Sequence, residues 1–307
     1  MSTNQVQRAT EDEIDLRELL AVIWRGKWII IATTFVFAVA AVFYALSLPN
    51  IYKSEALLAP AAEQKSAGLS GQLGGLAALA GVSLGGGAGV DKTALAIEVV
   101  KSREFLSRFI QQRINLQDLM AAKSWDLGSN TVNYDSGIFD PQTQRWLREV
   151  NPPRQAEPSK QEAYKAFSEI LTVSQDKATF MVKISIEHVS PYLAQNWLTM
   201  LIADLNLEMK SRDMAEAEKS ITYLQQQISQ TNLADLKAAL FSLIEEQTKT
   251  LMLANVRDEY AFKTIDPAIV PELKAKPARA LIVILAAILG GILSSLFVIV
   301  RGVKKLN

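Results

Sequence analysis

Two long apolar runs without a charged residue constrain this chain more than any other feature. They extend from Trp28 to Leu48 and from Ala280 to Val300, near the two ends of a 307-residue sequence. A helix of about 20 residues crosses the hydrocarbon core of a bilayer, which is about 30 Å thick. A helix of a soluble protein usually carries one charged face, and neither run has one. We therefore predict transmembrane helices at residues 28–48 and 280–300.

A cleaved signal peptide is the alternative interpretation of the first run, because Ala45-Leu46-Ser47 resembles a small-residue cleavage site. The apolar core of a signal peptide is about 7–15 residues long and follows a basic leader. This run is longer, and its leader is acidic between Glu11 and Glu18. A retained membrane anchor is therefore favoured.

Basic residues predict the orientation of the two spans. Arg17, Arg25 and Lys27 precede the first span, whereas only Lys53 lies close to it on the other side. Because cytoplasmic flanks carry an excess of Lys and Arg, we expect both termini in the cytoplasm and residues 49–278 to be exported. The seven residues after the second span are expected to be too short to fold, which argues against a sensor output domain or a fused kinase.

The composition argues against several classes of function. Thirty-two basic and 32 acidic residues cancel, so no nucleic-acid partner is expected. The sequence has no cysteine for thiolate chemistry or zinc binding, and His188 is its only histidine. Glycoside cleavage needs two carboxylates across one cleft. The adjacent pairs Glu245-Glu246 and Asp258-Glu259 would point in different directions on a helix. We expect no catalytic, metal or cofactor site, and hence no enzyme.

The region between the spans begins with a predicted α/β base at residues 49–189. Strand patterns occur at residues 51–59 and within Leu171–Val189, where apolar and polar residues alternate. Asp176-Lys177 supplies a turn in the second pattern, Phe180 is expected on its buried face, and His188 has a structural role at its end.

Helices are predicted at residues 91–113, where Ser102 is suited to cap a second helix, and at residues 159–170. Between them, residues 115–158 combine turn signals with aromatic residues. These aromatic residues are expected to form a local core rather than a sugar-stacking surface; they are Trp125, Tyr134, Phe139 and Trp146.

A glycine-rich segment, Gly68–Gly89, interrupts the base. The following Lys92-Thr93 superficially resembles a phosphate-binding loop, but that motif needs glycine directly before the lysine, and Val90-Asp91 intervene. A flexible surface loop is one interpretation. Its regularly spaced leucines leave a second one open, namely a segment at the membrane surface or in a subunit contact.

A long helical hairpin is predicted at residues 190–262. Ser190 and Pro191 are the residue types preferred at a helix start, and Thr231-Asn232 is expected to break the helix, with Asn232 as the cap of the next one. Apolar residues with alternating spacings of three and four predict a seam for helix pairing. This seam is formed by Met214, Ala217, Ile221, Leu224 and Ile228.

The chain then enters a predicted proline-rich strap at residues 263–279. Pro267, Pro271 and Pro277 disfavour a regular helix, and Arg279 follows them at the edge of the second span. Within that span, small residues recur every fourth position and predict a helix-packing face. The face consists of Ala286, Ala287, Gly290, Gly291, Ser294 and Ser295.

Three stretches resemble the chain-length determinant (Wzz) family, the class 1 polysaccharide co-polymerases. They are Asp12–Ile31 before the first span, His188–Pro191 with Ala194 and Trp197, and Leu243–Glu272 continuing to Arg279. The family's proline-rich motif is only partly present. Lys276 stands where the family usually has serine, and Ala278 intervenes before Arg279.

The resemblance implies an α+β membrane protein in which two transmembrane helices flank a periplasmic α/β base with a long projecting helical hairpin. It further implies a homo-oligomer in the bacterial inner membrane that sets the modal length of a lipid-linked surface polysaccharide, such as lipopolysaccharide O-antigen. The implied partners are membrane lipid, a separate polymerase and an undecaprenyl-linked glycan. The alternative is an export adaptor that works with a separate cytoplasmic tyrosine kinase.

These interpretations divide the chain into seven parts. They are a cytoplasmic segment (1–27), the first span (28–48), the base (49–189), the hairpin (190–262), the strap (263–279), the second span (280–300) and a cytoplasmic tail (301–307).

Overall fold

A computed structural model describes residues 24–61 and 92–306, without the side chains of residues 302–306. The chain divides into two compact units. The terminal unit comprises Met1–Asn50 and Ala275–Asn307, and the central unit comprises Ile51–Lys274. The predictions for residues 1–23 and for Gly68–Gly89 lie outside the described residues.

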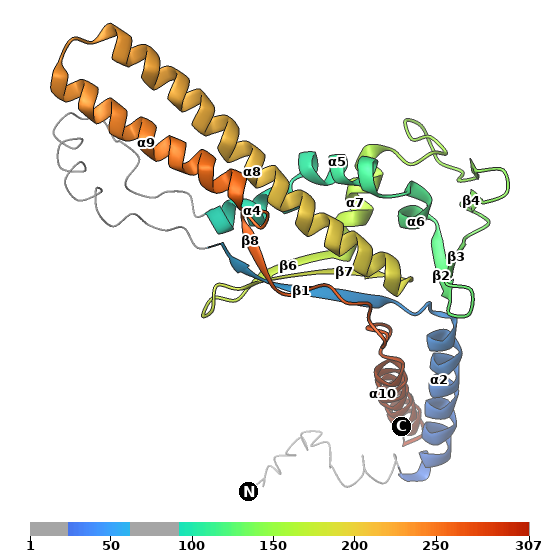
Figure 1. The fold of residues 1–307 in the computed structure, drawn as a ribbon. Helices are drawn as coiled ribbons and strands as arrows, with labels where there is room; N and C mark the ends of the chain where they lie inside the picture. Colours follow the sequence, from blue (N-terminus) through green and yellow to red (C-terminus); the bar gives the residue numbers. More distant parts are fainter. Residues whose placement is uncertain (1–23, 62–91, 307) are drawn as a thin grey trace, which may run out of the picture. The chain divides into compact units, whose positions relative to one another are not determined.

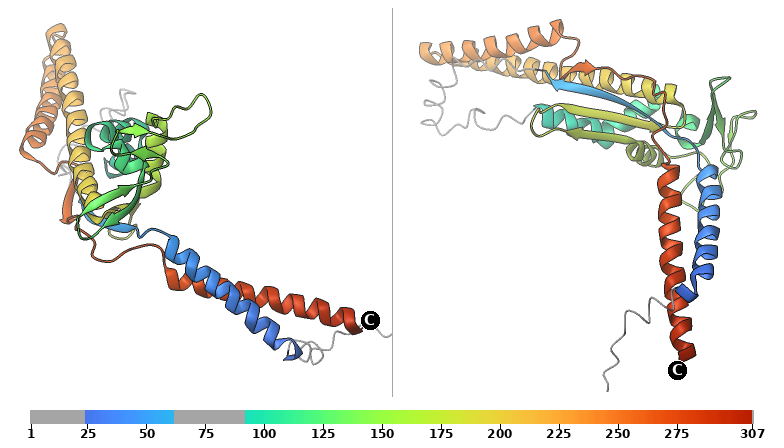
Figure 2. Two further views of the ribbon diagram at one scale, coloured as in Figure 1. Left: turned by 90° about the vertical axis from the view of Figure 1, so that its right-hand side faces the viewer. Right: turned by 90° about the horizontal axis from the view of Figure 1, so that it is seen from below.

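The terminal unit is built from two apolar helices that lie side by side (Figure 2). They are α2 (Lys27–Ser47) and α10 (Arg279–Leu306), and both are long and apolar enough to cross a membrane. The predicted spans are therefore helical. The second helix extends beyond the predicted end of the span at residue 300, because α10 continues to Leu306.

The central unit contains a four-stranded antiparallel sheet in the order β6-β7-β1-β8 (Figure 1). The first strand after the terminal unit, β1 (Tyr52–Pro60), lies between β7 (Val182–His188) and β8 (Phe262–Asp266). The edge strand β6 (Leu171–Gln175) pairs with β7 through the predicted turn at Asp176-Lys177.

Period-two alternation gives this sheet one apolar face. Ala56 and Leu58 of β1 pair with Ile184 and Val182 of β7, and all four are buried. The alternate positions carry charge, and Glu55 forms ion pairs with Lys53 and Lys183. The hydrogen bond from Lys53 is the largest cause of a lowered pKa at Glu55.

Four helices cover the apolar face and complete the core. They are α4 (Lys92–Lys101), α5 (Arg103–Arg113), α7 (Lys160–Ile170) and the first part of α8 (Pro191–Gln230). Phe109, Phe167 and Trp197 are the largest side chains at their junction. As predicted, Ser102 caps α5 by accepting from the Phe105 N–H, and Ser190 caps α8 by accepting from the Leu193 N–H.

Residues 115–158 form small elements around a local aromatic cluster. A short helix α6 (Leu116–Met120) precedes two ribbons, β2 (Ala122–Asp126) with β3 (Thr131–Tyr134) and β4 (Phe139–Asp140) with β5 (Arg145–Trp146). Phe139 is buried between Tyr134 and Trp146, with ring centroids 5.7 and 5.0 Å away.

This region is also tied to α7 by an ion pair between Arg148 and Glu162, with Nη1 3.1 Å from Oε1. Hydrogen bonds from Arg148 and then from the Ser159 N–H lower the pKa of Glu162 to about 2.

After α8, the chain turns back through α9 (Ala234–Val256) to form the helical hairpin (Figure 1). The 40 residues of α8 rise about 60 Å. The break after Gln230 was predicted, but the cap was not. Leu233 occupies the N-cap position without a side-chain cap, so the prediction of Asn232 is wrong.

Two further expectations are wrong. Phe180 is 61% exposed with a φ of 58°, because it lies in the turn before β7 rather than on the buried face. The strap begins after Asp266 rather than at residue 263, because β8 pairs with β1 as a strand of the sheet.

Candidate functional site

The small-residue face of α10 lies against α2 of the same chain. Gly290 and Ser294 are buried, and Ala286, Ala287, Gly291 and Ser295 are half-buried. A Cβ atom at Gly290 would lie 2.9 Å from two carbon atoms of Phe37, whereas one at Gly291 would lie 3.7 Å from Thr34 Oγ1. The close approach of the two helices therefore requires glycine at position 290 but tolerates a methyl group at position 291.

The hydroxyl groups of this face are bonded within α10. Ser294 Oγ and Ser295 Oγ donate to the Gly291 carbonyl oxygen at 3.0 and 2.7 Å. Polar groups in a bilayer have no water to bond, so this arrangement keeps both hydroxyls satisfied.

Arg279, the first residue of α10, binds the end of α2. Its Nε donates to the Ala45 carbonyl oxygen at 3.0 Å, and its Nη2 lies 3.4 Å from the Leu48 carbonyl oxygen and 3.1 Å from Asn50 Oδ1. The last carbonyls of a helix have no partner in the helix and carry the negative end of its dipole. The guanidinium group therefore caps α2. The sequence signal at Arg279 predicted a membrane boundary, but it did not predict this bond.

The strap contains no helix between Pro267 and Ala278. The first part of the strap forms hydrogen bonds with two elements of the central unit, β1 and α8. Ser54 Oγ of β1 donates to the Ile269 carbonyl oxygen at 2.8 Å, and Gln195 Nε2 of α8 lies 3.3 Å from the Ala268 carbonyl oxygen. Pro267 is exposed, while Pro271 and Pro277 are half-buried.

The predicted seam of α8 lies in the part of the helix that pairs with α9. Ala217 is buried there, and Met214, Ile221, Leu224 and Ile228 are half-buried. On the opposite helix only Ala254 is buried. Small residues on both helices therefore allow close approach, while the larger residues keep part of their surface in contact with solvent.

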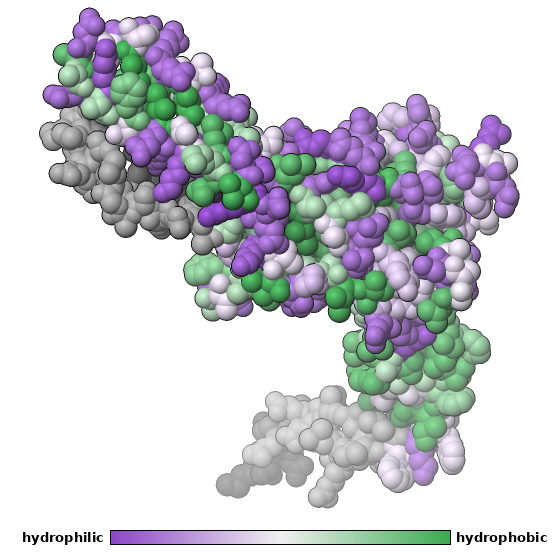
Figure 3. All heavy atoms as spheres, viewed as in Figure 1, coloured by the Kyte–Doolittle hydropathy of each residue, from purple (hydrophilic) through white to green (hydrophobic). Residues whose placement is uncertain are grey.

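A second row of residues on α9 has no covering element among the described residues. Phe241, Met252 and Val256 are 58, 65 and 82% exposed. With Ala238, Glu245 and Thr248, also exposed, they follow spacings of three and four and share one side of the helix. We call this row the outer stripe. Figure 3 shows apolar atoms along the hairpin between hydrophilic ones.

Asn206 of α8 fastens the returning chain to the base, and the sequence patterns did not point to it. Its Oδ1 accepts from the N–H groups of Ala261 and Phe262 at 2.8 and 2.9 Å, and its Nδ2 donates to the Phe262 carbonyl oxygen at 3.1 Å. The buried amide thus pairs with the start of β8 as a neighbouring strand would.

The buried His188 links the sheet to α6. Its Nδ1 accepts from the Ser190 N–H at 3.0 Å, so its Nε2 carries the proton and donates to the Asp118 carbonyl oxygen at 2.9 Å. Burial against the Trp197 ring lowers the pKa of His188 and keeps the ring neutral. These contacts give it a structural role.

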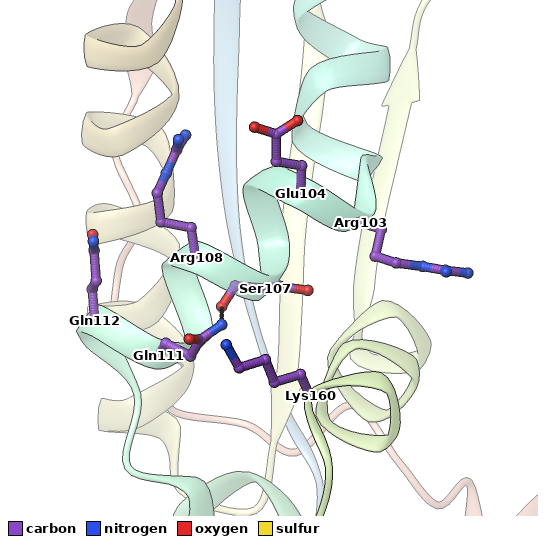
Figure 4. A pocket seen from close by; sticks show the side chains of 7 residues that line it. All are labelled: Arg103, Glu104, Ser107, Arg108, Gln111, Gln112 and Lys160. Atoms are coloured by element: carbon purple, nitrogen blue, oxygen red, sulfur yellow. Dashed lines mark hydrogen bonds between the residues drawn. The ribbon is translucent and has the colours of Figure 1, made fainter.

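A shallow groove of about 530 Å³ runs along α5 and the start of α7 (Figure 4). Three basic residues, Arg103, Arg108 and Lys160, and the acidic Glu104 line it together with polar residues. Arg103 and Arg108 point away from each other, and Arg108 is paired with Glu208 at 2.5 Å. The side chains do not converge on one point. In a preformed ligand-binding site, the polar side chains would point toward a common centre.

Residues 24–61 and 92–306 contain no group of three or more His, Cys, Asp or Glu side chains that could hold a metal ion. The candidate functional features of this chain are therefore its packing surfaces. They lie on the pair of helices α2 and α10, on the hairpin of α8 and α9, and on the strap.

Two family models match this chain, each over a different part of it. The model of the chain length determinant protein (Wzz) matches residues 12–113, which include α2, β1, α4 and α5. The model of the "G-rich domain on putative tyrosine kinase" matches residues 225–303, which include α9, the strap and most of α10. Residues 12–113 are thus similar to the Wzz chain length determinant family.

The match to the Wzz family model and the two helices that are long and apolar enough to cross a bilayer fit a membrane protein. A solved structure described as a full-length bacterial polysaccharide co-polymerase is similar to it, with a TM-score of 0.40 and 16% identity over 95% of this chain and 98% of that chain. No curated protein matches the sequence.

Proposed function

We propose that this chain regulates the modal length of a lipid-linked surface polysaccharide, such as lipopolysaccharide O-antigen, as a homo-oligomeric scaffold without bond-forming chemistry of its own. The main support is the match to the chain length determinant model together with an architecture made of packing surfaces. Bond formation then belongs to a separate polymerase held by the oligomer, and the polymer is an undecaprenyl-linked glycan.

Deletion of the gene tests this proposal most directly. Loss of a length regulator broadens the ladder of surface polysaccharide on a gel and leaves its total amount close to that of the parent strain. Complementation with the full chain restores the modal length. Complete loss of polymer in the deletion strain would contradict the proposal, because it would indicate a role in synthesis or export.

The outer stripe is the surface that we propose for contact between subunits. A two-helix hairpin buries little of its own surface, and a row of exposed Phe, Met and Val side chains is suited to a partner of the same kind. Such a contact supports a ring in which neighbouring hairpins stand next to one another.

Two charged substitutions on the stripe, Phe241→Glu and Met252→Glu, are expected to reduce the particle mass in detergent, as measured by light scattering. Leu207→Glu on α8 is the matched control, because Leu207 is 61% exposed and lies outside the stripe. Equal effects of the stripe and control variants would contradict this assignment.

A second candidate function is an export adaptor that works with a separate cytoplasmic tyrosine kinase. The match of residues 225–303 to a domain described on tyrosine kinases is the observation that favours it. Co-purification of a kinase with this chain, together with loss of export on deletion, would support the adaptor. Altered polymer length with normal export would support the regulator.

We also propose that both termini are cytoplasmic and that the central unit is periplasmic. Two basic residues support this orientation, namely Arg25 before α2 and Lys27 as the first residue of α2. A single cysteine at the exposed Leu233 should react with a membrane-impermeant thiol reagent in intact cells whose outer membrane has been permeabilised. Labelling that requires disruption of the inner membrane would contradict the orientation.

A further inference from the structure

Three aromatic rings from distant parts of the chain meet at the start of the central unit. Tyr52 begins β1, Trp125 lies in β2, and Tyr192 lies in the first turn of α8. The ring centroid of Trp125 is 5.7 Å from that of Tyr52 and 6.0 Å from that of Tyr192. Tyr192 remains 49% exposed. The inner side of this cluster holds the β2–β3 ribbon to the sheet, and its outer side faces away from the core.

Leu127 extends this cluster outward. It lies at the tip of the turn between β2 and β3, two residues after Trp125, and is 80% exposed. The turn is fixed, because Asp126 Oδ1 accepts from the backbone N–H and the hydroxyl of Ser129, both at 2.7 Å. The side chain of Trp125 is also fixed, since its Nε1–H donates to Asn130 Oδ1 at 2.8 Å. A leucine is therefore held outward on a rigid polar turn.

Chain connectivity keeps this cluster close to the bilayer. α2 ends at Ser47 and its cap is Leu48, so Tyr52 follows the end of the span by four residues. Four residues span at most about 14 Å when fully extended. The polar region of a bilayer is about 5–8 Å thick on each side of the hydrocarbon core. Tyr and Trp are enriched at this depth because their rings are apolar and their N–H and O–H groups reach water.

We propose that Tyr192, Trp125 and Leu127, which we call the interfacial patch, form a contact with the lipid surface. The Leu127 side chain enters the boundary between headgroups and acyl chains, and the two aromatic rings lie at headgroup level. The β2–β3 turn thereby provides the central unit with a membrane contact in addition to its two covalent connections to the spans. The occupant of the patch is lipid rather than glycan, because an exposed leucine offers a sugar no hydrogen bond.

The absence of cysteine makes this contact measurable in the full chain. Leu127→Cys carries the only thiol and can be labelled with a nitroxide after reconstitution into phospholipid nanodiscs. The accessibility of the label to oxygen relative to a water-soluble nickel chelate reports its depth. The matched control is Leu233→Cys, because Leu233 is 68% exposed and lies beyond the far end of α8, about 60 Å from Tyr192.

We expect the oxygen-to-nickel ratio at position 127 to exceed that at position 233 by at least about twofold, as for a side chain at the acyl boundary. Equal ratios would overturn the proposal. Protection of position 127 only after addition of purified polysaccharide would also overturn it, because the patch would then be a saccharide surface. As a control for folding, the far-ultraviolet circular dichroism of the labelled protein must match that of the unlabelled chain. We expect this match because Leu127 is exposed.

Discussion

The two halves of α8 belong to the same helix but have different surroundings. From Ala194 to Met209, seven apolar residues are buried against the sheet and the helices α4, α5 and α7. From Lys210 to Gln230, only Ala217 is buried, and its partner helix α9 contributes only Ala254. The first half is therefore part of a core, whereas the second half is part of a two-helix pair.

This difference indicates that the first half of α8 stabilises the fold, whereas the second half is available for contacts with other molecules. The base buries enough apolar surface to define its own fold, because its core combines strands and helices from the whole central unit. A hairpin with two buried alanines gains little free energy from its own packing, so its rigidity depends on continuity with the base and on contacts with other molecules. Substitutions in the two halves of α8 should consequently affect different measurements.

The largest predicted effect comes from removing a ring in the first half. Trp197→Ala deletes a side chain that is 2% exposed and should cost about 3–5 kcal/mol of unfolding free energy. Leu224→Ala in the half-buried seam should cost about 1 kcal/mol. Urea unfolding of the purified chain, followed by far-ultraviolet circular dichroism, measures both. Equal losses would remove the distinction between the two halves of the helix.

A smaller loss of unfolding free energy is expected when the hydrogen bonds between Asn206 and the start of β8 are removed. Asn206→Leu has a similar volume but leaves the buried Phe262 N–H without its acceptor, which costs about 1–3 kcal/mol. Because β8 is then released from α8, hydrogen exchange should increase in Phe262–Asp266 more than in β7. Gln226→Leu on the exposed part of α8 is the control and should change stability by less than about 0.5 kcal/mol. An unchanged exchange rate in β8 would contradict the role of Asn206.

Much of the fold could be predicted because local patterns and tertiary packing agree. The alternation in Leu171–Val189 gives two paired strands, and Ser190-Pro191 begins a helix whose first turn needs a cap. Phe180 was misplaced because a turn with positive φ interrupts the alternation without any glycine to indicate it. The partners of Arg279 and Asn206 could not be predicted, since each bond joins residues more than 50 positions apart.

A substitution between the helices α2 and α10 should cost as much stability as Asn206→Leu, or less. Gly290→Ala places a methyl group 2.9 Å from Phe37 and should weaken the packing of α2 with α10 by roughly 1–3 kcal/mol. Gly291→Ala is matched in chemistry, but its methyl group makes an ordinary contact 3.7 Å from Thr34 and should be nearly neutral. The thermal midpoint in detergent should fall only for the first variant. A similar midpoint for both variants would show that the helices are not in close contact at position 290.

The smallest predicted effect is a pH dependence of the base. Burial lowers the pKa of His188 below its ordinary value of 6.5, so the unfolded chain binds the proton more tightly. The stability contributed by neutral His188 is therefore fully present above pH 6.5 and decreases as the pH falls below it, until the folded pKa is reached. Protonation would place an N–H of the ring against the Ser190 N–H.

Urea unfolding at a series of pH values between 5 and 8 measures this slope. His188→Gln lacks the titrating group, so the part of the slope below pH 6.5 should disappear in this variant. An unchanged slope would assign the pH dependence to other groups.

The bond from Arg279 to the end of α2 also has a consequence for biogenesis. Arg279 is translated 234 residues after Ala45, whose carbonyl oxygen it binds. At a synthesis rate of about 5–20 residues per second, Arg279 is synthesised roughly 10–50 s after the end of α2 that it caps. During that interval, water or lipid headgroups must satisfy the last carbonyls of α2. The two helices can therefore pack into one structural unit only after the whole central unit has been synthesised.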